Sequence, residues 1–178
     1  MGLFSFLNAE LLATTAQALK QVATKAAVAV TPGRDVKYIF VHCTAGPPNQ
    51  STQEIKNYWA RKYPTWKGRP GYHIMVDADG TRHRLQEDWL YTNGVAGYNS
   101  HALHVCYKGG QGGKDTRTPA QKRELLLIIA RWKKMYPNAK VLGHRDASPD
   151  KNKDGQITAD EWIKTCPNFN AIPEYQHL

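Results

Sequence analysis

The sequence has few cysteines, a shortage of acidic residues and no long apolar run. Its 178 residues, enough for about one domain with a sizeable core, include only Cys43, Cys106 and Cys166. An odd number of widely spaced cysteines argues against a disulfide framework and favours a reducing compartment or a metal ligand. No stretch of about 18 uninterrupted apolar residues occurs, so a membrane-spanning helix is not expected.

Acidic residues are outnumbered by basic ones, 15 Asp+Glu against 24 Lys+Arg, which gives a formal net charge of +9. This balance favours an anionic partner such as nucleic acid, anionic lipid or a cell-wall polymer. The sequence has no basic stripe interleaved with stacking aromatic residues, so we expect no nucleic-acid partner.

The first 33 residues differ from the rest of the chain. No basic residue precedes the first apolar run, and Asn8 and Glu10 interrupt that run, so no secretory signal peptide is recognised. Apolar residues recur with the spacing of one helical stripe, which predicts an amphipathic helix that packs on its own domain or contacts an anionic membrane or envelope. Because Thr31-Pro32-Gly33 would end such a helix, we expect an N-terminal segment at 1–33 and a second domain at 34–178.

Beyond residue 33 the chain alternates strand-like and helix-like stretches. The expected fold is therefore α/β, a central mixed β-sheet flanked by helices, with the amphipathic helix as an N-terminal addition. The turn residues DADG at 77–80 lie between two alternating runs and predict a hairpin, so part of the sheet should be antiparallel. A helix is expected to begin after Thr118, with Pro119 in its first turn, and to stop before Pro137.

Three residues that follow apolar segments could form a metal site. His42 stands at the end of the strand-like run VKYIFVHC, where its neighbour Cys43 must point to the opposite face. His144 follows a second short apolar strand in GHRDASP, and Cys166 lies in KTCPNF. Two imidazoles and one thiolate are typical of a catalytic zinc site that leaves a fourth position to water, whereas structural zinc sites close with four ligands.

The motifs YIFVHC, GYHI, YNSHALHVCYKGG, GHRD and KTCP, in this order over roughly residues 36–170, resemble those of a known enzyme family. They are similar to the zinc-dependent N-acetylmuramoyl-L-alanine amidases of the phage-lysozyme and peptidoglycan-recognition-protein superfamily. The resemblance implies that His42, His144 and Cys166 bind zinc. It also implies catalytic roles for Tyr72 and Lys164 beside the activated water and the scissile carbonyl. Without it, Tyr72 could be a buried strand aromatic and Lys164 a solvated charge.

The substrate and biological setting also follow from the resemblance. It implies hydrolysis of the amide between N-acetylmuramic acid and L-alanine in bacterial peptidoglycan, as in a phage or prophage endolysin held in the host cytoplasm until it reaches the wall. Two alternatives stay open. One is a non-catalytic peptidoglycan-binding protein on the same scaffold, and the other is a zinc peptidase that cuts within the stem peptide.

One segment departs from the resemblance, because the connection between His144 and Cys166 contains DKNKDGQITADE at 150–161. This segment matches a calcium-binding EF-hand loop by position, including the glycine at the sixth place. The calcium ligands that the pattern predicts are Asp150, Asn152, Asp154, Gln156 and Glu161. Pro149 precedes the loop, so it lacks the usual entering helix, and a surface turn that binds nothing is the alternative.

Overall fold

The computed structural model describes residues 33–178, so the amphipathic helix predicted within 1–33 lies almost wholly outside the described part. Within that part, five strands form one sheet: β1 Tyr38–Cys43, β2 Ile74–Val76, β3 Arg82–Arg84, β4 Ala102–Tyr107 and β5 Lys140–Gly143. The helices are α2 Thr52–Lys62, α3 Pro119–Met135 and α4 Ala171–Tyr175, with short 3-10 turns η1 Pro64–Trp66, η2 Asn99–His101, η3 Gln111–Gly113 and η4 His144–Ala147. None of the helices in residues 33–178 is long and apolar enough to cross a membrane.

The sheet is mixed, as the alternation of elements predicts, with strand order β3-β2-β4-β1-β5. β1 pairs in parallel with β4 and β5, β2 pairs in parallel with β4, and β3 runs antiparallel to β2 at one edge. The hairpin expected at DADG is the β2–β3 connection, where the Asp77 amide donates to the Thr81 carbonyl at 2.9 Å and Gly80 has φ of +92°. The predicted α/β class, a mixed sheet flanked by helices, is confirmed for residues 33–178.

The two longer helices begin where the sequence supplies caps. The Ser51 hydroxyl and the Glu54 side chain form a capping box at the start of α2. Thr118 and Gln121 form the same arrangement at α3, with Pro119 in the first turn, as predicted. Both boxes satisfy backbone N–H groups that would otherwise lack partners, so they fix where each helix starts against the sheet.

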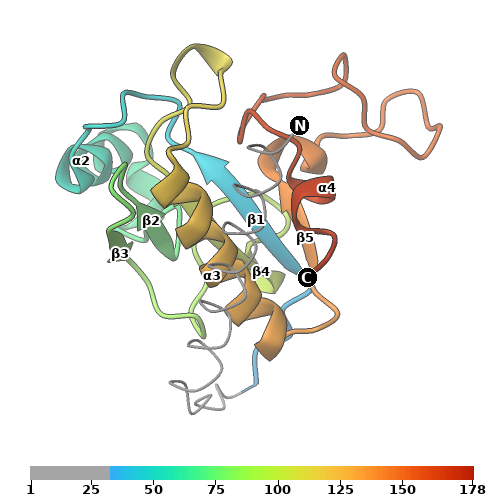
Figure 1. The fold of residues 1–178 in the computed structure, drawn as a ribbon, viewed down its shortest axis with the longest axis horizontal. Helices are drawn as coiled ribbons and strands as arrows, with labels where there is room; N and C mark the ends of the chain where they lie inside the picture. Colours follow the sequence, from blue (N-terminus) through green and yellow to red (C-terminus); the bar gives the residue numbers. More distant parts are fainter. Residues whose placement is uncertain (1–32) are drawn as a thin grey trace, which may run out of the picture. The chain divides into compact units, whose positions relative to one another are not determined.

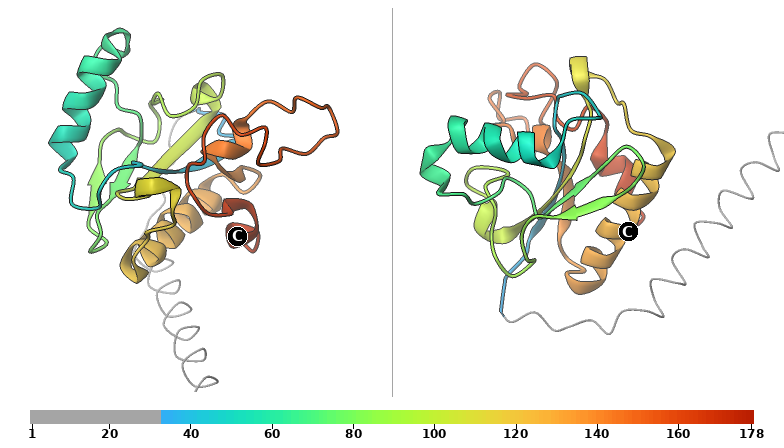
Figure 2. Two further views of the ribbon diagram at one scale, coloured as in Figure 1. Left: turned by 90° about the horizontal axis from the view of Figure 1, so that it is seen from above. Right: turned by 90° about the vertical axis from the view of Figure 1, so that its left-hand side faces the viewer.

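The helices cover opposite faces of the sheet, which Figures 1 and 2 show as three layers. The α3 side is the larger core, where Leu125, Ile128 and Trp132 pack on alternate strand residues such as Val41 and Val105. The α2 side carries a smaller cluster, in which Ile55 and Trp59 meet Met75 and Cys106. Because side chains alternate along a strand, each central strand gives hydrophobic residues to α3 and a second set, histidines included, to the other face.

Candidate metal centre and active site

His42 is the next-to-last residue of β1, and its side chain lies on the sheet face opposite α3. Its neighbour Cys43 packs in the core cluster of the α3 side. The sequence prediction that these two residues point to different faces is therefore confirmed. His42 itself is fully buried, which is unusual for a polar side chain without a functional or hydrogen-bonded role.

His144 and Cys166 reach the same end of the sheet by different routes. β5 pairs in parallel with β1, with Val41 opposite Gly143, so His144 emerges directly after β5 and beside the end of β1. Cys166 comes from the long returning segment, and the Arg145 amide donates to its carbonyl at 2.8 Å. The Cys43 amide also donates to the Cys166 sulfur at 3.2 Å. The end of the sheet thus holds both residues by backbone contacts.

The three side chains converge closely. The Nδ1 atoms of His42 and His144 are 3.1 Å apart, and the Cys166 Sγ lies 3.8 Å from the His42 Nδ1. All three donor atoms lie within 4.8 Å of one another, and no other group of three such side chains in residues 33–178 meets this condition. Two nitrogen donors and one sulfur donor at this spacing suit zinc in its three-protein-ligand, catalytic form.

The electrostatics of the cluster also suit a cation. Burial, and then the charge of Lys164, lower the pKa of His144 to about 4, and burial lowers the pKa of His42 well below its usual value. Both imidazoles are therefore neutral at physiological pH, as metal ligands must be. The Cys43 thiol and burial raise the pKa of the Cys166 thiol, so its sulfur needs a cation in place of the proton to become a thiolate.

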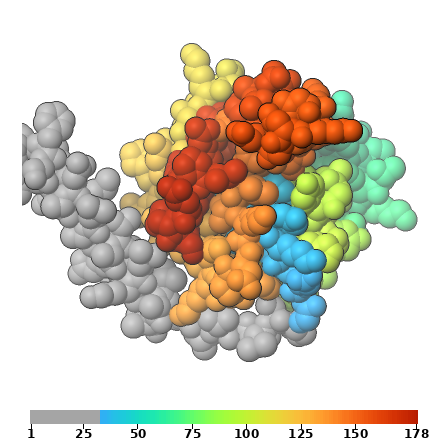
Figure 3. All heavy atoms as spheres, turned by 90° about the vertical axis from the view of Figure 1, so that its right-hand side faces the viewer, coloured from blue at the N-terminus to red at the C-terminus, as the bar shows by residue number. Residues whose placement is uncertain are grey.

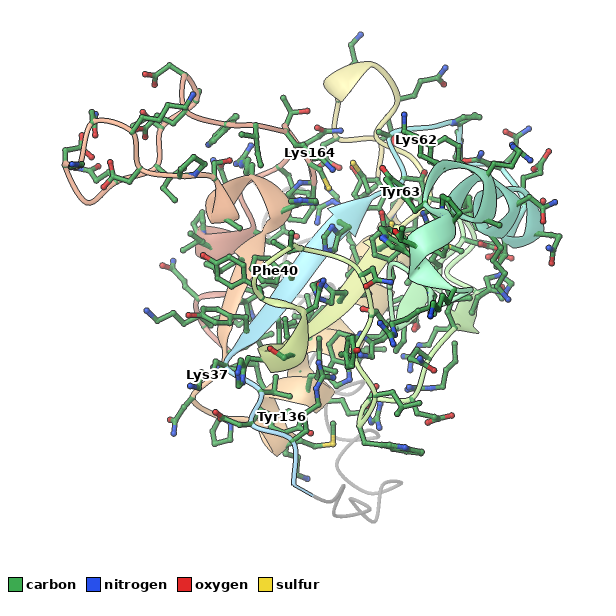
Figure 4. The ribbon with its side chains drawn as sticks, turned by 180° about the vertical axis from the view of Figure 1, so that it is seen from behind. Lys37, Phe40, Lys62, Tyr63, Tyr136 and Lys164 are labelled. Atoms are coloured by element: carbon green, nitrogen blue, oxygen red, sulfur yellow. The ribbon has the colours of Figure 1, made fainter. Side chains whose placement is uncertain are left out.

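Two residues of the cluster, His144 and Cys166, line a cleft with a volume of about 680 Å³, and the buried His42 contacts both of them. One wall is the segment that carries His144, Ile163 and Lys164. The other wall comes from α2 and η1, and Figure 4 shows Tyr63 and Lys164 on the two sides of the end of β1. This second wall is strongly aromatic, with the side chains Tyr58, Trp59, Tyr63 and Trp66.

Tyr72 and Lys164, the two residues with implied catalytic roles, both line this cleft. The Tyr72 ring lies 4.9 Å from the His42 ring and 5.3 Å from the Trp59 ring, between centroids. Burial raises the pKa of Tyr72 well above its usual value, so the phenol stays protonated and can donate a hydrogen bond. Lys164 is exposed, and its positive charge lowers the pKa values of both His42 and His144.

The predicted calcium loop at 150–161 has a different geometry. The Asp150 carboxylate accepts from the amides of Lys153 at 2.6 Å and Gly155 at 2.8 Å. The Glu161 carboxylate accepts from the amides of Lys151 at 2.7 Å and Thr158 at 3.0 Å. The other predicted ligands lie in an exposed stretch and are joined by hydrogen bonds between residues two positions apart. These ligands are Asn152, Asp154 and Gln156.

The carboxylates of the loop therefore bind the loop's own backbone. In residues 33–178 they do not form a converging group as the His42 cluster does. In Figure 3 this segment lies on the outer surface of the molecule, where orange-red spheres gather. Calcium ligation stays a prediction of the sequence pattern.

Two buried histidines next to the cluster received no role from the sequence. The His42 Nε2 lies 3.1 Å from the Nδ1 of His104 in β4, and the His104 amide donates to the Nδ1 of His73 at 3.0 Å. These two histidines are His73 and His104. Both are fully buried, and only the pairing of β1 with β4 brings His104 against His42.

Comparison with known proteins decides the family. The family model described as N-acetylmuramoyl-L-alanine amidase matches residues 32–167. The chain belongs to this amidase family. It is accordingly a peptidoglycan-hydrolysing enzyme, and the predicted activity class is confirmed.

Individual relatives agree with the family of this amidase. The endolysin of Klebsiella phage KP32 is 28% identical over 151 residues, which cover 82% of this chain and 89% of the relative. A Haemophilus influenzae protein described as uncharacterized is 40% identical over 81 residues, 43% of this chain and 70% of the relative.

Solved structures support the fold. The Ph2119 endolysin of a Thermus scotoductus bacteriophage has a TM-score of 0.61 at 23% identity, with 76% of this chain and 79% of that chain covered. Bumblebee PGRP-SA has a TM-score of 0.60 at 14% identity, with 80% and 81% covered. At these identities the likeness concerns the fold of the amidase and not its individual residues.

Proposed function

We propose that this amidase cleaves the amide between N-acetylmuramic acid and L-alanine of the peptidoglycan stem, with zinc held by His42, His144 and Cys166. The observation that carries the proposal is the convergence of two neutral imidazoles and one thiol sulfur, two of which line an open cleft. Zinc bound there would supply a Lewis acid that polarises the carbonyl and lowers the pKa of water towards neutrality.

Tyr72 and Lys164 provide the remaining polar groups of the reaction. The Tyr72 hydroxyl keeps its proton because its pKa is raised, so it can donate to negative charge that develops on the carbonyl oxygen. The Lys164 ammonium is exposed on the cleft wall and brings a full positive charge to the same region. One donor of this kind contributes roughly 10²–10³ to the rate of acyl-transfer enzymes.

The walls of the cleft suit a substrate that is part sugar and part peptide. On one rim Tyr58 is 47% exposed, and on the other Ile163 is 63% exposed. Exposed apolar side chains that face a cleft favour binding, because substrate covers them on association. The net charge of +9 adds attraction to an anionic cell envelope.

The setting that we propose is a lytic enzyme held in the host cytoplasm until it is released to the wall, and relatives described as endolysins support it. Contact with an anionic membrane through residues 1–32 is part of this proposal. It rests on the sequence pattern alone, since those residues lie outside the described part of the chain. Flotation of the full chain with anionic and neutral lipid vesicles tests it, and equal absence from both lipid fractions would reject it.

Mass spectrometry of digested peptidoglycan tests the proposed reaction. Purified peptidoglycan is incubated with the zinc-loaded protein, with the chelated protein and with His144→Ala. The expected products are free stem peptides that begin with L-alanine, and these disappear after chelation and in the variant. Cuts inside the stem would instead support a zinc peptidase. Intact peptidoglycan that retains the protein would support a binding protein without activity.

A further inference from the structure

His104 contacts the proposed zinc ligand His42 and does not line the cleft. It belongs to the central strand β4, its side chain is fully buried, and its Nδ1 is 3.1 Å from the Nε2 of His42. The parallel register pairs Phe40 with His104 and His42 with Cys106, so the two histidines are diagonal neighbours on one face of the sheet. Their contact therefore depends on the two strands that form the centre of the fold.

The direction of this hydrogen bond is linked to the metal site. The His42 Nδ1 faces the His144 Nδ1 at 3.1 Å and the Cys166 sulfur at 3.8 Å, so this nitrogen would bind zinc. A ligating nitrogen carries no proton, so the proton of neutral His42 sits on Nε2 and is donated to the Nδ1 of His104. The reverse direction would put the proton of His42 on Nδ1 and block the ligand position.

The His104 ring is fixed for this role on both faces. It stacks on the Phe40 ring with centroids 5.6 Å apart and an interplanar angle of 9°, and on the His73 ring at 5.9 Å and 11°. Its edge touches the backbone of Gly94, where an added Cβ would lie only 2.3 Å from the His104 Nδ1. The imidazole cannot turn without displacing these neighbours.

The other ring nitrogen of His104 is also informative. Its Nε2 is buried and has no hydrogen-bond partner in the described part of the chain. An unpartnered buried polar atom costs free energy, and a purely structural role would be served better by an apolar side chain of similar shape. Among residues 33–178, the hydrogen bond that the ring makes is the one with His42.

We propose that His104 is a positioning residue for zinc: it accepts the Nε2 proton of His42 and so holds the His42 Nδ1 unprotonated and aimed at the metal. The inference rests on the proposed zinc function of His42. Metal-ligating histidines commonly donate their second nitrogen to a carboxylate, carbonyl or water, and loss of such partners typically weakens metal binding 10–100-fold. Here a second imidazole takes that place.

The test measures zinc affinity on the full chain by competition with a chromophoric chelator. His104→Phe keeps a stacked ring but removes the acceptor, and we expect zinc binding 10–100-fold weaker than in the native protein. His104→Asn places a side-chain oxygen near the former Nδ1 and should restore most of the affinity. Native affinity in a folded His104→Phe protein would overturn the inference.

Cys106→Ala is the matched control, because Cys106 is buried on the same strand and face and stands opposite His42 in the register. It should leave zinc affinity unchanged even if it lowers stability. His42→Ala distinguishes a wrong zinc site from a wrong role for His104. If His42→Ala binds zinc normally, the proposed zinc site is wrong. If His42→Ala loses zinc affinity while His104→Phe keeps it, only the role of His104 is rejected.

A measurement on the native protein avoids the risk that a variant fails to fold. Long-range ¹H–¹⁵N NMR spectra of the zinc-loaded chain report which nitrogen of each histidine carries the proton. We expect His42 to be protonated on Nε2 and His104 to be unprotonated on Nδ1. A proton on the Nδ1 of His104 would overturn the inference. Gly94→Ala leaves both histidines in the sequence, but its added methyl group should displace the His104 ring and weaken zinc binding. Unchanged zinc affinity in that variant would contradict the proposed position of the ring.

Discussion

The two ion sites that the sequence predicts, the zinc cluster and the calcium loop, are built in opposite ways. His42, His144 and Cys166 are far apart in the sequence, yet their donor atoms lie within 4.8 Å of one another. The calcium loop is twelve consecutive residues, and its Asp150 and Glu161 carboxylates accept hydrogen bonds from amides of the same loop. A local pattern supplies ligand types in the right order, but it does not by itself bring donor atoms together.

The difference has a physical cause in what surrounds the donor atoms. The imidazoles of His42 and His144 are held neutral by burial, and their Nδ1 atoms lie 3.1 Å apart. The loop carboxylates are in contact with N–H groups that already stabilise their charge. The cluster therefore gains most from a cation, whereas the loop is stabilised in part without one.

The largest expected effect comes from breaking the cluster. His144→Ala or Cys166→Ser removes one of three ligands, and we expect loss of stoichiometric zinc and a fall in kcat of at least about 10³-fold, since the metal contributes several kcal/mol to the transition state. Metal analysis and the rate of stem-peptide release measure the two effects. His177→Ala changes an exposed histidine and is the control. Full zinc content with full activity in His144→Ala would show that the cluster is not the metal centre.

The next effect separates zinc binding from catalysis. Tyr72→Phe and Lys164→Met remove proposed donors but no metal ligand, so each should lower kcat roughly 10²–10³-fold while zinc content stays native. Lys134→Met removes an equal charge from the exposed side of α3 and should have little effect. If either cleft variant loses zinc, that side chain supports the metal site, and the proposed catalytic role would need revision.

Much of the fold could be predicted from local sequence, because local interactions decide it. Thr118 and Pro119 mark the start of α3, and the DADG turn marks the hairpin, each through contacts within a few residues. The three residues that we propose as zinc ligands are candidates from the sequence, because His42 lies at the end of one apolar strand and His144 follows another, and because the order of the motifs resembles that of the amidase family.

The role of His104 could not be predicted in this way. Its contact with His42 exists only because β1 and β4 pair in parallel with Phe40 opposite His104. Strand partners and register are set by the whole sheet, and no spacing within one strand reveals them. The alternation of side chains along a strand places His104 and Cys106 on the same face of the sheet. It does not say which face of the sheet meets the cleft.

In the zinc-free protein, the pH dependence of stability should distinguish the buried histidines around the zinc cluster from the calcium loop. Burial lowers the pKa of both His144 and His73 to about 4, whereas the unfolded value is about 6.5. Between these values the unfolded chain binds more protons, so the free energy of unfolding should fall as pH falls from about 6.5 to about 4. Urea unfolding at several pH values measures it, and constant stability from pH 7 to 4.5 would contradict the buried neutral histidines.

The contribution of the calcium loop to the free energy of unfolding should change in a lower pH range. The Thr158 amide and other backbone donors lower the pKa of Glu161 below its usual 4.5. Its contribution is therefore complete above pH 4.5 and is lost only as pH falls through the lower folded value. Glu161→Gln should alter the unfolding curve only in that lower range, while His144→Gln should alter only the range between about 6.5 and 4. A variant that changes both ranges would show that the regions are coupled.

The smallest expected effect is that of calcium, and it decides whether the loop acts on the active site. If the loop binds calcium in the range of about 0.1–1 mM, a concentration ten times Kd should raise the Tm of the zinc-loaded protein by about 3–5 °C, and Glu161→Gln should abolish the rise. Calorimetric titration measures the binding itself. Absence of heat and of any Tm change would leave a surface turn that binds nothing.

The base of the loop is already closed by contacts that need no ion. The Arg145 guanidinium lies 4.1 Å from the centre of the Trp162 ring, and the Ile163 amide donates to the Ser148 hydroxyl at 3.1 Å. These contacts hold the segment that leads to Lys164 and Cys166, so calcium should change kcat less than about twofold. If kcat rises with calcium in the native protein but not in Glu161→Gln, the loop positions Lys164 despite this closure. Calcium would then regulate the zinc site through the geometry of residues 161–166.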